Sequence, residues 1–345
     1  MRLGLYIFAT LTLTAIIGAF AYTINSGNYV LELMGINFNL PVAVWFVLPM
    51  LVLLVFTILH MLFYGLKNYF KLKKWQRDAA TLDDALYWAL VHEPKDQKFI
   101  LDEIKNSAVI LSKASIDITE GVEGLNPRLT KVLGIVQKIK SGEYVDLKEQ
   151  KMAKVFSEGN PLLIQNRLNR LDVDKEFVEE VMRSATSYSK LVQKKALELF
   201  AGSETFYKAR KYAKVFDVTN FKKMLARING NEGMGLSMEI LNEFIEGLPL
   251  GCMDFVFIAD TIKKQFTPDQ NLAFFKRLQQ NNPKAQNAYL YLLFEYEMLE
   301  EVDRYLDEQG EDEFIKFRAL YELKQEHKNY KLEDLVEVDT ICNEA

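Results

Sequence analysis

Two long runs without an acidic or basic side chain lie close together at the start of this 345-residue chain. The first, Leu3 to Tyr22, is about 20 residues long, the length that a helix needs to cross the apolar core of a bilayer. The second, Val42 to Tyr64, follows after a short segment and contains a single histidine, His60. The pattern predicts two transmembrane helices, because a helix satisfies its own backbone hydrogen bonds inside lipid.

A cleavable signal peptide is the rival interpretation of the first run. Ala19-Phe20-Ala21 places small residues where such a peptide would be cut. The second run argues against simple secretion, because it would stop the transfer of the chain across the membrane. We therefore predict that the first helix is retained.

The segment between the two runs has the pattern of a small hairpin. Asn25-Ser26-Gly27 is a turn signal, and apolar residues then alternate with polar ones on both sides of Gly35. Pro41 is suited to the first position of the second helix, where the missing N–H has no partner in any case. Pro49 lies inside that helix, and membrane helices tolerate such a kink.

Basic residues follow the second run at once, at Lys67, Lys71, Lys73, Lys74 and Arg77. The loop between the runs has none, while Arg2 precedes the first run. The positive-inside rule then places both termini in the cytoplasm, which predicts a bacterial inner-membrane protein. The same cluster is suited to contact anionic lipid headgroups, although it is equally well explained as a topology signal alone.

These features resemble a known type of membrane module. A first span leads through Ser26-Gly27-Asn28-Tyr29-Val30-Leu31-Glu32-Leu33 and Gly35-Ile36-Asn37-Phe38-Asn39-Leu40-Pro41 into a second span with a basic exit. The pattern resembles the double-span module of LapA-type lipopolysaccharide assembly proteins. It is also similar to the N-terminal part of HemY-type proteins, which join two spans to a cytoplasmic helical-repeat domain. The resemblance covers residues 1–77 and implies an anchor followed by a tetratricopeptide-like domain.

Charge is distributed unevenly between the anchor and the rest of the chain. Of 42 basic and 47 acidic side chains, six basic and one acidic lie in residues 1–77, which leaves a net charge of -10 for residues 78–345. An acidic domain is not expected to bind nucleic acid in bulk. Cys252 and Cys342 match no metal or redox spacing, and in a cytosolic domain they are predicted to be reduced, structural thiols.

Residues 78–345 show helical apolar spacing almost throughout, which predicts an all-α domain. Thr81 and Asp84 resemble a cap for a helix that begins at Leu82. Short connections between many helices favour stacked pairs, an α-solenoid of degenerate tetratricopeptide-like or HEAT-like type. The segments 268–280, 284–308 and 311–328 come closest to a repeat. No fixed period emerges, so an irregular helical bundle is the alternative.

Residues with catalytic or ligating chemistry are sparse. His60, His92 and His327 do not lie at metal-ligand spacing from one another or from a cysteine. Residues 230–235 contain three glycines but lack the Gly-Lys-Ser/Thr of a phosphate loop, so they are interpreted as a connection between helices. The sequence therefore predicts no catalytic site, no metal and no cofactor.

One basic stretch is the best candidate for a binding surface. Its cationic side chains are Lys208, Arg210, Lys211, Lys214, Lys222, Lys223 and Arg227, with Asp217 as the one acid among them. The interleaved aromatic residues Phe206, Tyr207, Tyr212, Phe216 and Phe221 fit core positions of helices. The stretch is interpreted either as a solvated helix face or as a surface for an acidic protein segment or anionic lipid, with nucleic acid the least favoured partner.

Together these observations predict a non-enzymatic scaffold or assembly factor of the inner membrane. Its clients are expected to be integral membrane proteins or parts of an envelope machine, bound through the helical domain in a chaperone-like manner. The alternatives are a stability factor for a motility or secretion motor, direct pairing of the spans with client helices, and an enzyme of lipid or envelope-precursor metabolism.

Overall fold

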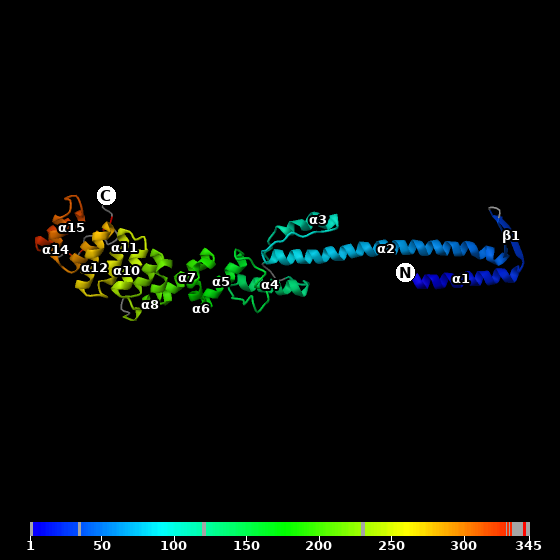
Figure 1. Cartoon of the computed structure of the whole chain (residues 1–345), viewed down its shortest axis with the longest axis horizontal. Helices are drawn as coiled ribbons and strands as arrows, with labels where there is room; N and C mark the ends of the chain where they lie inside the picture. Colours follow the sequence, from blue (N-terminus) through cyan, green and yellow to red (C-terminus); the bar gives the residue numbers. More distant parts are fainter. Residues whose placement is uncertain are drawn as a thin grey trace. The chain divides into compact units, whose positions relative to one another are not determined.

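The computed structural model describes residues 3–33, 36–118, 122–228, 232–328, 330, 332 and 341–342. Within these residues lie fifteen α-helices and one two-stranded sheet, so the mainly helical class is confirmed (Figure 1). Arg2, Gly35 and Gly230, on which predictions above depend, lie outside the described residues. By internal contacts the chain divides into two units, Met1–Val132 and Leu133–Ala345, which are described in turn.

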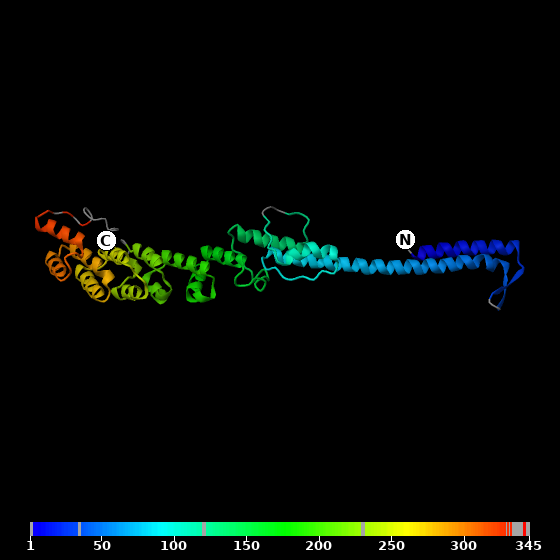
Figure 2. The ribbon, with the colours of Figure 1, turned by 90° about the horizontal axis from the view of Figure 1, so that it is seen from above.

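The first unit begins with the two helices expected to cross a membrane. Helices α1 (Leu3–Ile24) and α2 (Val42–Leu90) are both long and apolar enough to do so. They contact one another and run in opposite directions (Figures 1 and 2). Large apolar side chains stay exposed along both, such as Phe8 at 71% and Phe56 at 65%. Acyl chains would cover such a surface in a bilayer.

Small and hydroxylated residues suit these helices to close contact in an apolar medium. A Cβ added to Gly18 of α1 would lie only 3.1 Å from Val47 of α2, so the glycine permits this approach. Thr14 is buried between the helices, and its hydroxyl donates to the Thr10 carbonyl at 2.7 Å. The polar hydroxyl is thereby satisfied within its own helix.

Strands β1 (Asn28–Leu33) and β2 (Ile36–Pro41) form the predicted hairpin between the spans. They pair antiparallel, with Asn28 opposite Pro41. Two hydrogen bonds join the hairpin to the start of α2. The Val42 N–H donates to the Gly27 carbonyl at 3.0 Å, and Trp45 Nε1 donates to the Tyr29 carbonyl at 3.2 Å.

Helix α2 is one continuous helix of 49 residues and extends far beyond the predicted span. The expected new helix beginning at Leu82 does not exist. Instead of capping a helix, the Thr81 hydroxyl donates to the Arg77 carbonyl at 3.0 Å within the same helix. The reason is that no proline or glycine stands between Gly65 and Pro94, so nothing in the sequence stops helix propagation.

A buried carboxylate connects the far part of α2 to the next helix. Asp78 is 0% exposed and accepts hydrogen bonds from the N–H groups of Ile100, at 3.0 Å, and Leu101, at 2.7 Å. These N–H groups immediately precede α3 (Asp102–Ala108), so Asp78 satisfies donors that the start of a helix leaves without intrahelical partners. The 3-10 helix η1 (Val109–Ser112) follows and contacts α2.

Helix α4 (Pro127–Lys140) carries the division between the units, and the second unit continues with helix after helix. The longer ones are α5 (Pro161–Val173), α6 (Lys175–Arg183), α7 (Lys190–Ser203), α9 (Val218–Ala226), α10 (Met238–Gly247), α11 (Cys252–Ile262), α12 (Pro268–Asn281), α13 (Gln286–Glu295), α14 (Leu299–Asp307) and α15 (Ile315–Gln325). Alternate helices contact one another: α5 contacts α7, α7 contacts α9, α9 contacts α11, and α11 contacts α13. Figure 2 shows the helices of this unit following one another along the ribbon, from green to orange.

Short connecting elements complete this unit. They are the one-turn helix α8 (Phe206–Ala209) and the 3-10 helices η2 (Ala185–Ser187), η3 (Arg210–Val215), η4 (Glu232–Met234) and η5 (Pro283–Ala285). The repeat-like segment 284–308 is not a single helix, because α13 ends at Glu295 and Glu297 adopts a φ of 54° before α14 begins. A residue in this left-handed conformation cannot continue an α-helix.

Aromatic side chains form much of the core of the second unit. Phe206, Phe221 and Phe244 are 0% exposed and lie on α8, α9 and α10. The rings of Phe221 and Phe244 stack with centroids 5.2 Å apart, and Phe206 meets Phe244 edge to face. Such pairs add to the stabilisation that burial itself supplies.

The two cysteines depart from the prediction of separate, reduced thiols. Cys252 at the start of α11 and Cys342 near the C-terminus form a disulfide across 90 residues of sequence. Asn287 of α13 donates to Cys252 Sγ at 3.1 Å and to the Ile341 carbonyl at 3.5 Å. One side chain of α13 therefore contacts both chain segments that the disulfide joins. Sequence spacing did not indicate this contact, because the pairing depends on how α11 and α13 pack.

Candidate functional site

The basic stretch predicted as a binding surface lies on α8, η3 and α9, and four of its cations form ion pairs with acidic side chains. Lys208 pairs with Glu204 at 3.0 Å, Lys222 with Asp254 at 3.0 Å, and Lys223 with Glu198 at 3.1 Å. Arg210 pairs with Glu243, and Arg227 donates to the carbonyls of Ala201 and Glu204. Lys211 and Lys214 are exposed. The seven cations therefore do not form one uncompensated patch.

The aromatic residues of that stretch divide into two groups. Phe206, Phe216 and Phe221 are buried as their helical spacing predicts. Tyr207 is 73% exposed, so the expectation of a core position is wrong for this residue. It shares the single turn of α8 with Phe206, and adjacent helical residues do not share a face.

The basic residues after the second span are all exposed on α2. Lys67, Lys71, Lys73, Lys74 and Arg77 lie among exposed apolar side chains, including Phe70 at 53% and Trp75 at 44%. Lys67 Nζ lies 6.0 Å from the centre of the Tyr64 ring. Cations mixed with aromatic rings are typical of helix segments at a membrane surface.

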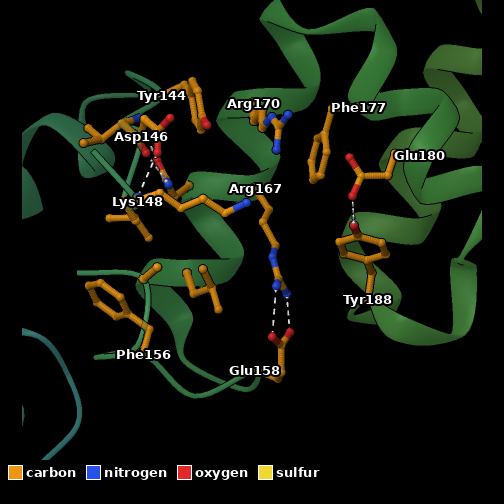
Figure 3. A pocket seen from close by; sticks show the side chains of 15 residues that line it. Tyr144, Asp146, Lys148, Phe156, Glu158, Arg167, Arg170, Phe177, Glu180 and Tyr188 are labelled. Atoms are coloured by element: carbon orange, nitrogen blue, oxygen red, sulfur yellow. Dashed lines mark hydrogen bonds and ion pairs between the residues drawn. The ribbon is translucent and has the colours of Figure 1, made fainter. Parts of the chain in front are cut away.

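A cleft of about 390 Å³ in the second unit brings charged and aromatic side chains together, and sequence reasoning did not find it (Figure 3). Its floor is α5, which begins where Asn160 Oδ1 accepts from the N–H groups of Leu162 and Leu163 at 2.8 and 3.2 Å. Pro161 takes the first helical position, where its missing N–H has no partner in any case. The neighbouring α6 begins in the same way at Asp174, which accepts from the Phe177 N–H at 3.1 Å.

Two buried asparagines of α5 fix the loop that forms one wall of the cleft. Asn166 donates to the Val145 carbonyl at 2.8 Å and accepts from the Val145 N–H at 2.9 Å. Asn169 donates to the carbonyls of Ile139 and Glu143 at 2.7 and 3.0 Å. Because buried backbone groups need partners, these bonds determine where Tyr144 lies.

Two arginines of α5, one turn apart, point into the cleft. Arg167 forms a two-pronged ion pair with Glu158, at 2.5 and 3.1 Å, and its guanidinium lies 5.1 Å from the centre of the Tyr188 ring. Arg170 lies 4.1 Å from the ring centre of Phe177 and 5.6 Å from that of Tyr144. Flat guanidinium groups stack favourably on aromatic rings, so each arginine is held in place without losing its charge.

The pKa shifts in the cleft agree with this arrangement. The hydrogen bond from Arg167 lowers the pKa of Glu158 and outweighs the effect of burial. Burial raises the pKa of Tyr188, and the hydrogen bond that its hydroxyl donates to Glu180 at 2.8 Å adds to the rise. Near neutral pH the Glu158 carboxylate is therefore charged, and the phenols of Tyr144 and Tyr188 are neutral.

A weak signal for the cleft is present in the sequence. Arg167 and Arg170 are three residues apart in a helix, a spacing that puts both on one face. Their partners Tyr144 and Glu158, and Phe156 of the cleft lining, lie in the non-helical segment between α4 and α5, where no periodicity reveals which side chain points inward. Asn166 and Asn169 give no signal in the sequence, because asparagine more often caps a helix or forms a turn than hydrogen-bonds to a buried loop.

No metal centre is evident among the residues that the structure describes, since no group of three His, Cys, Asp or Glu side chains lies close enough to hold an ion. The histidines are far from one another in the sequence and have different surroundings. The His60 ring lies 4.4 Å from the Tyr64 ring, and His92 Nε2 lies 2.8 Å from Asp117 Oδ1. Comparison with protein-family models, curated proteins and solved structures gives no match to this chain.

Proposed function

We propose that the protein is a membrane-tethered, non-enzymatic scaffold or assembly factor that holds client proteins at the cytoplasmic face of a bacterial inner membrane. The observation that carries this proposal is the row of alternate helices in the second unit, from α5 through α7, α9 and α11 to α13. Helices α6, α12 and α14 contact members of this row beside them. We interpret this row as stacked helix pairs of a degenerate α-solenoid, a type of fold that offers extended surfaces to protein segments.

The N-terminal helices supply the tether in this proposal. Helices α1 and α2 are the spans, the hairpin lies on the outer side, and the exposed basic residues at the end of the span lie against anionic headgroups. By its resemblance to LapA-type and HemY-type modules, the protein belongs to envelope assembly, and lipopolysaccharide assembly is one candidate process. Stabilisation of a motility or secretion motor is the alternative.

Within the second unit, the cleft on α5 is a better client site than the basic stretch. Cations are paired with acids both in the stretch and in the cleft, so charge alone does not favour either surface and their shape and composition decide. The cleft combines concave shape, aromatic walls and arginines, the residue types that contribute most to protein interfaces.

Photo-crosslinking in living cells tests the proposal. A photoreactive phenylalanine analogue at Leu191 or Tyr207, which are 64% and 73% exposed, reports what lies against the second unit. We expect discrete adducts with a membrane protein, identified by mass spectrometry and formed at more than one position. A chain whose two spans are replaced by an unrelated two-span anchor is the matched control, and it should keep the adducts. Absence of any protein adduct contradicts a scaffold role.

A further inference from the structure

We propose that the cleft on α5 binds a carboxylate of the client segment beside an aromatic side chain, and that Glu158 occupies the carboxylate position until the client displaces it. This inference rests on the proposed function, because it takes the ligand to be a protein segment. It adds the chemical class that the cleft recognises and an internal competitor that sets how tightly it binds.

The geometry around Arg167 already shows how a carboxylate fits. Both oxygens of Glu158 meet the guanidinium, and this fork-to-fork geometry suits any carboxylate, whether of a side chain or a chain terminus. The side chain of Arg167 is only 19% exposed, whereas that of Glu158 is 72% exposed. Arg167 is therefore fixed in the cleft, whereas the Glu158 side chain is largely in solvent.

Releasing Glu158 costs little because an ion pair with one highly exposed partner contributes weakly. Its backbone belongs to the turn before α5, outside any helix, so its side chain can swing away without disturbing the fold. A client carboxylate that arrives with further contacts of its own would replace it at Arg167.

Lys148 gives the cleft a second cationic group for such a ligand. In Figure 3 its side chain extends toward the middle of the cleft, in the gap between the two arginines. None of the carboxylates that the structure describes forms an ion pair with its ammonium. Arg170, by contrast, pairs at 2.9 Å with Asp174, the residue between α5 and α6. A ligand carboxylate at Arg167 would gain Lys148 as a further partner.

The aromatic walls determine the second half of the proposed ligand. Tyr144 and Phe177 flank Arg170, and Tyr188 flanks Arg167, so flat surfaces line the space on both sides of the cations. An aromatic side chain next to the carboxylate would pack edge to face or offset against these rings. The chemistry therefore favours acidic segments that contain phenylalanine or tyrosine.

The test is fluorescence anisotropy with the full chain in lipid nanodiscs. The probe is a short labelled peptide of alternating glutamate and phenylalanine, and the control peptide has glutamine in place of glutamate. We expect the acidic peptide to bind at least tenfold more tightly than the control. Equal binding of the two peptides, or displacement of the probe by excess inorganic phosphate, overturns the assignment to a carboxylate.

Variants test the internal competitor separately from folding. Glu158→Gln should tighten binding of the acidic peptide about threefold to fivefold, because the competing charge is gone. Glu326→Gln is the matched control, since Glu326 is an exposed acid that pairs with Lys328 at 2.9 Å and does not line the cleft, and it should leave the affinity unchanged. Lys148→Gln should weaken binding about fivefold or more. Unchanged or weaker binding by Glu158→Gln overturns the proposed displacement.

The outcome can be told apart from failure of the proposed function. If crosslinking in cells recovers client proteins but the acidic peptide does not bind, the scaffold role stands and the cleft assignment falls. If the peptide binds but no client is crosslinked, the cleft has the proposed chemistry and the scaffold role fails.

Discussion

Replacing Asn166 by alanine should destabilise the second unit and loosen one wall of the cleft. The side chain is 3% exposed and makes both hydrogen bonds with the backbone of Val145, whose own side chain is buried. Alanine would remove both bonds and leave the N–H and carbonyl of Val145 without these partners, in a place that water reaches poorly.

The magnitude follows from the two bonds. Each buried backbone group that loses its partner costs about 1 to 3 kcal/mol, so about 3 kcal/mol is expected for the pair after partial relaxation. In a unit of this size each 1 kcal/mol lowers the midpoint of thermal unfolding by about 2 to 4 °C. The variant should therefore unfold about 6 to 12 °C below the wild type.

The assay is thermal unfolding of the full chain in detergent, followed by near-ultraviolet circular dichroism. Asn281→Ala is the matched control, because Asn281 is an exposed asparagine of α12 that donates to the Arg277 carbonyl at 3.1 Å. It should change the free energy of unfolding by about 0.5 kcal/mol or less. If Asn166→Ala lowers the midpoint no more than Asn281→Ala does, the proposed role of Asn166 in holding the wall is wrong.

Three further predictions concern other parts of the chain. Asp78→Ala should lower the free energy of unfolding by about 2 to 3 kcal/mol, because it removes the acceptor for the Ile100 and Leu101 N–H groups. We expect faster hydrogen exchange over residues 100–108, and an unchanged exchange rate would contradict this role of Asp78. Burial acts to raise the pKa of Asp260, but hydrogen bonds from Lys263 and Tyr291 outweigh it and lower the pKa. The ionised carboxylate therefore stabilises the folded state fully above the ordinary pKa of 3.8, and this contribution is lost as the pH falls through the lowered pKa. Asp260→Asn should accordingly lower the unfolding midpoint at pH 7 by more than it does in strong acid, and an equal loss at both pH values would contradict the charge-based account. Alkylation of intact cells tests the compartment: a reducing cytoplasm should open the Cys252–Cys342 disulfide, so that both thiols react without added reductant. Modification only after a reductant would show that the disulfide persists, which would place the second unit in an oxidising compartment and overturn the proposed orientation.

The parts of the fold that follow from local pattern could be predicted from the sequence. The two apolar runs became helices α1 and α2, and the alternation around Gly35 became the β1–β2 hairpin, because hydrophobic length and periodicity act within a few residues of the chain. Pro161 at the start of α5 follows the same kind of local rule. The end of α2 was misplaced because a capping pattern at Thr81 carries no weight where nothing breaks the preceding helix.

The candidate site depended on contacts that local pattern does not encode. Clustered cations suggested a binding surface at 208–227, but partners from elsewhere in the sequence, such as Glu198 and Glu243, lie against them. The cleft was missed for the complementary reason. Glu158 and Tyr144 lie in the non-helical segment before α5. Hydrogen bonds from Asn166 and Asn169 to backbone carbonyls hold the Tyr144 part of this segment beside the arginines of the cleft.

The uninterrupted α2 makes the first unit a lever. A helix of 49 residues is about 73 Å long, and the part beyond Tyr64 accounts for about 39 Å of it. If α2 crosses a bilayer as proposed, a neighbour that tilted it there by about 10° would displace its far end at Leu90 by about 7 Å in the plane of the membrane. Because Asp78 fastens α3 to the moving arm, such a rocking motion would carry α3 with it. Crowding of helices within the bilayer would thereby be converted into a displacement outside it.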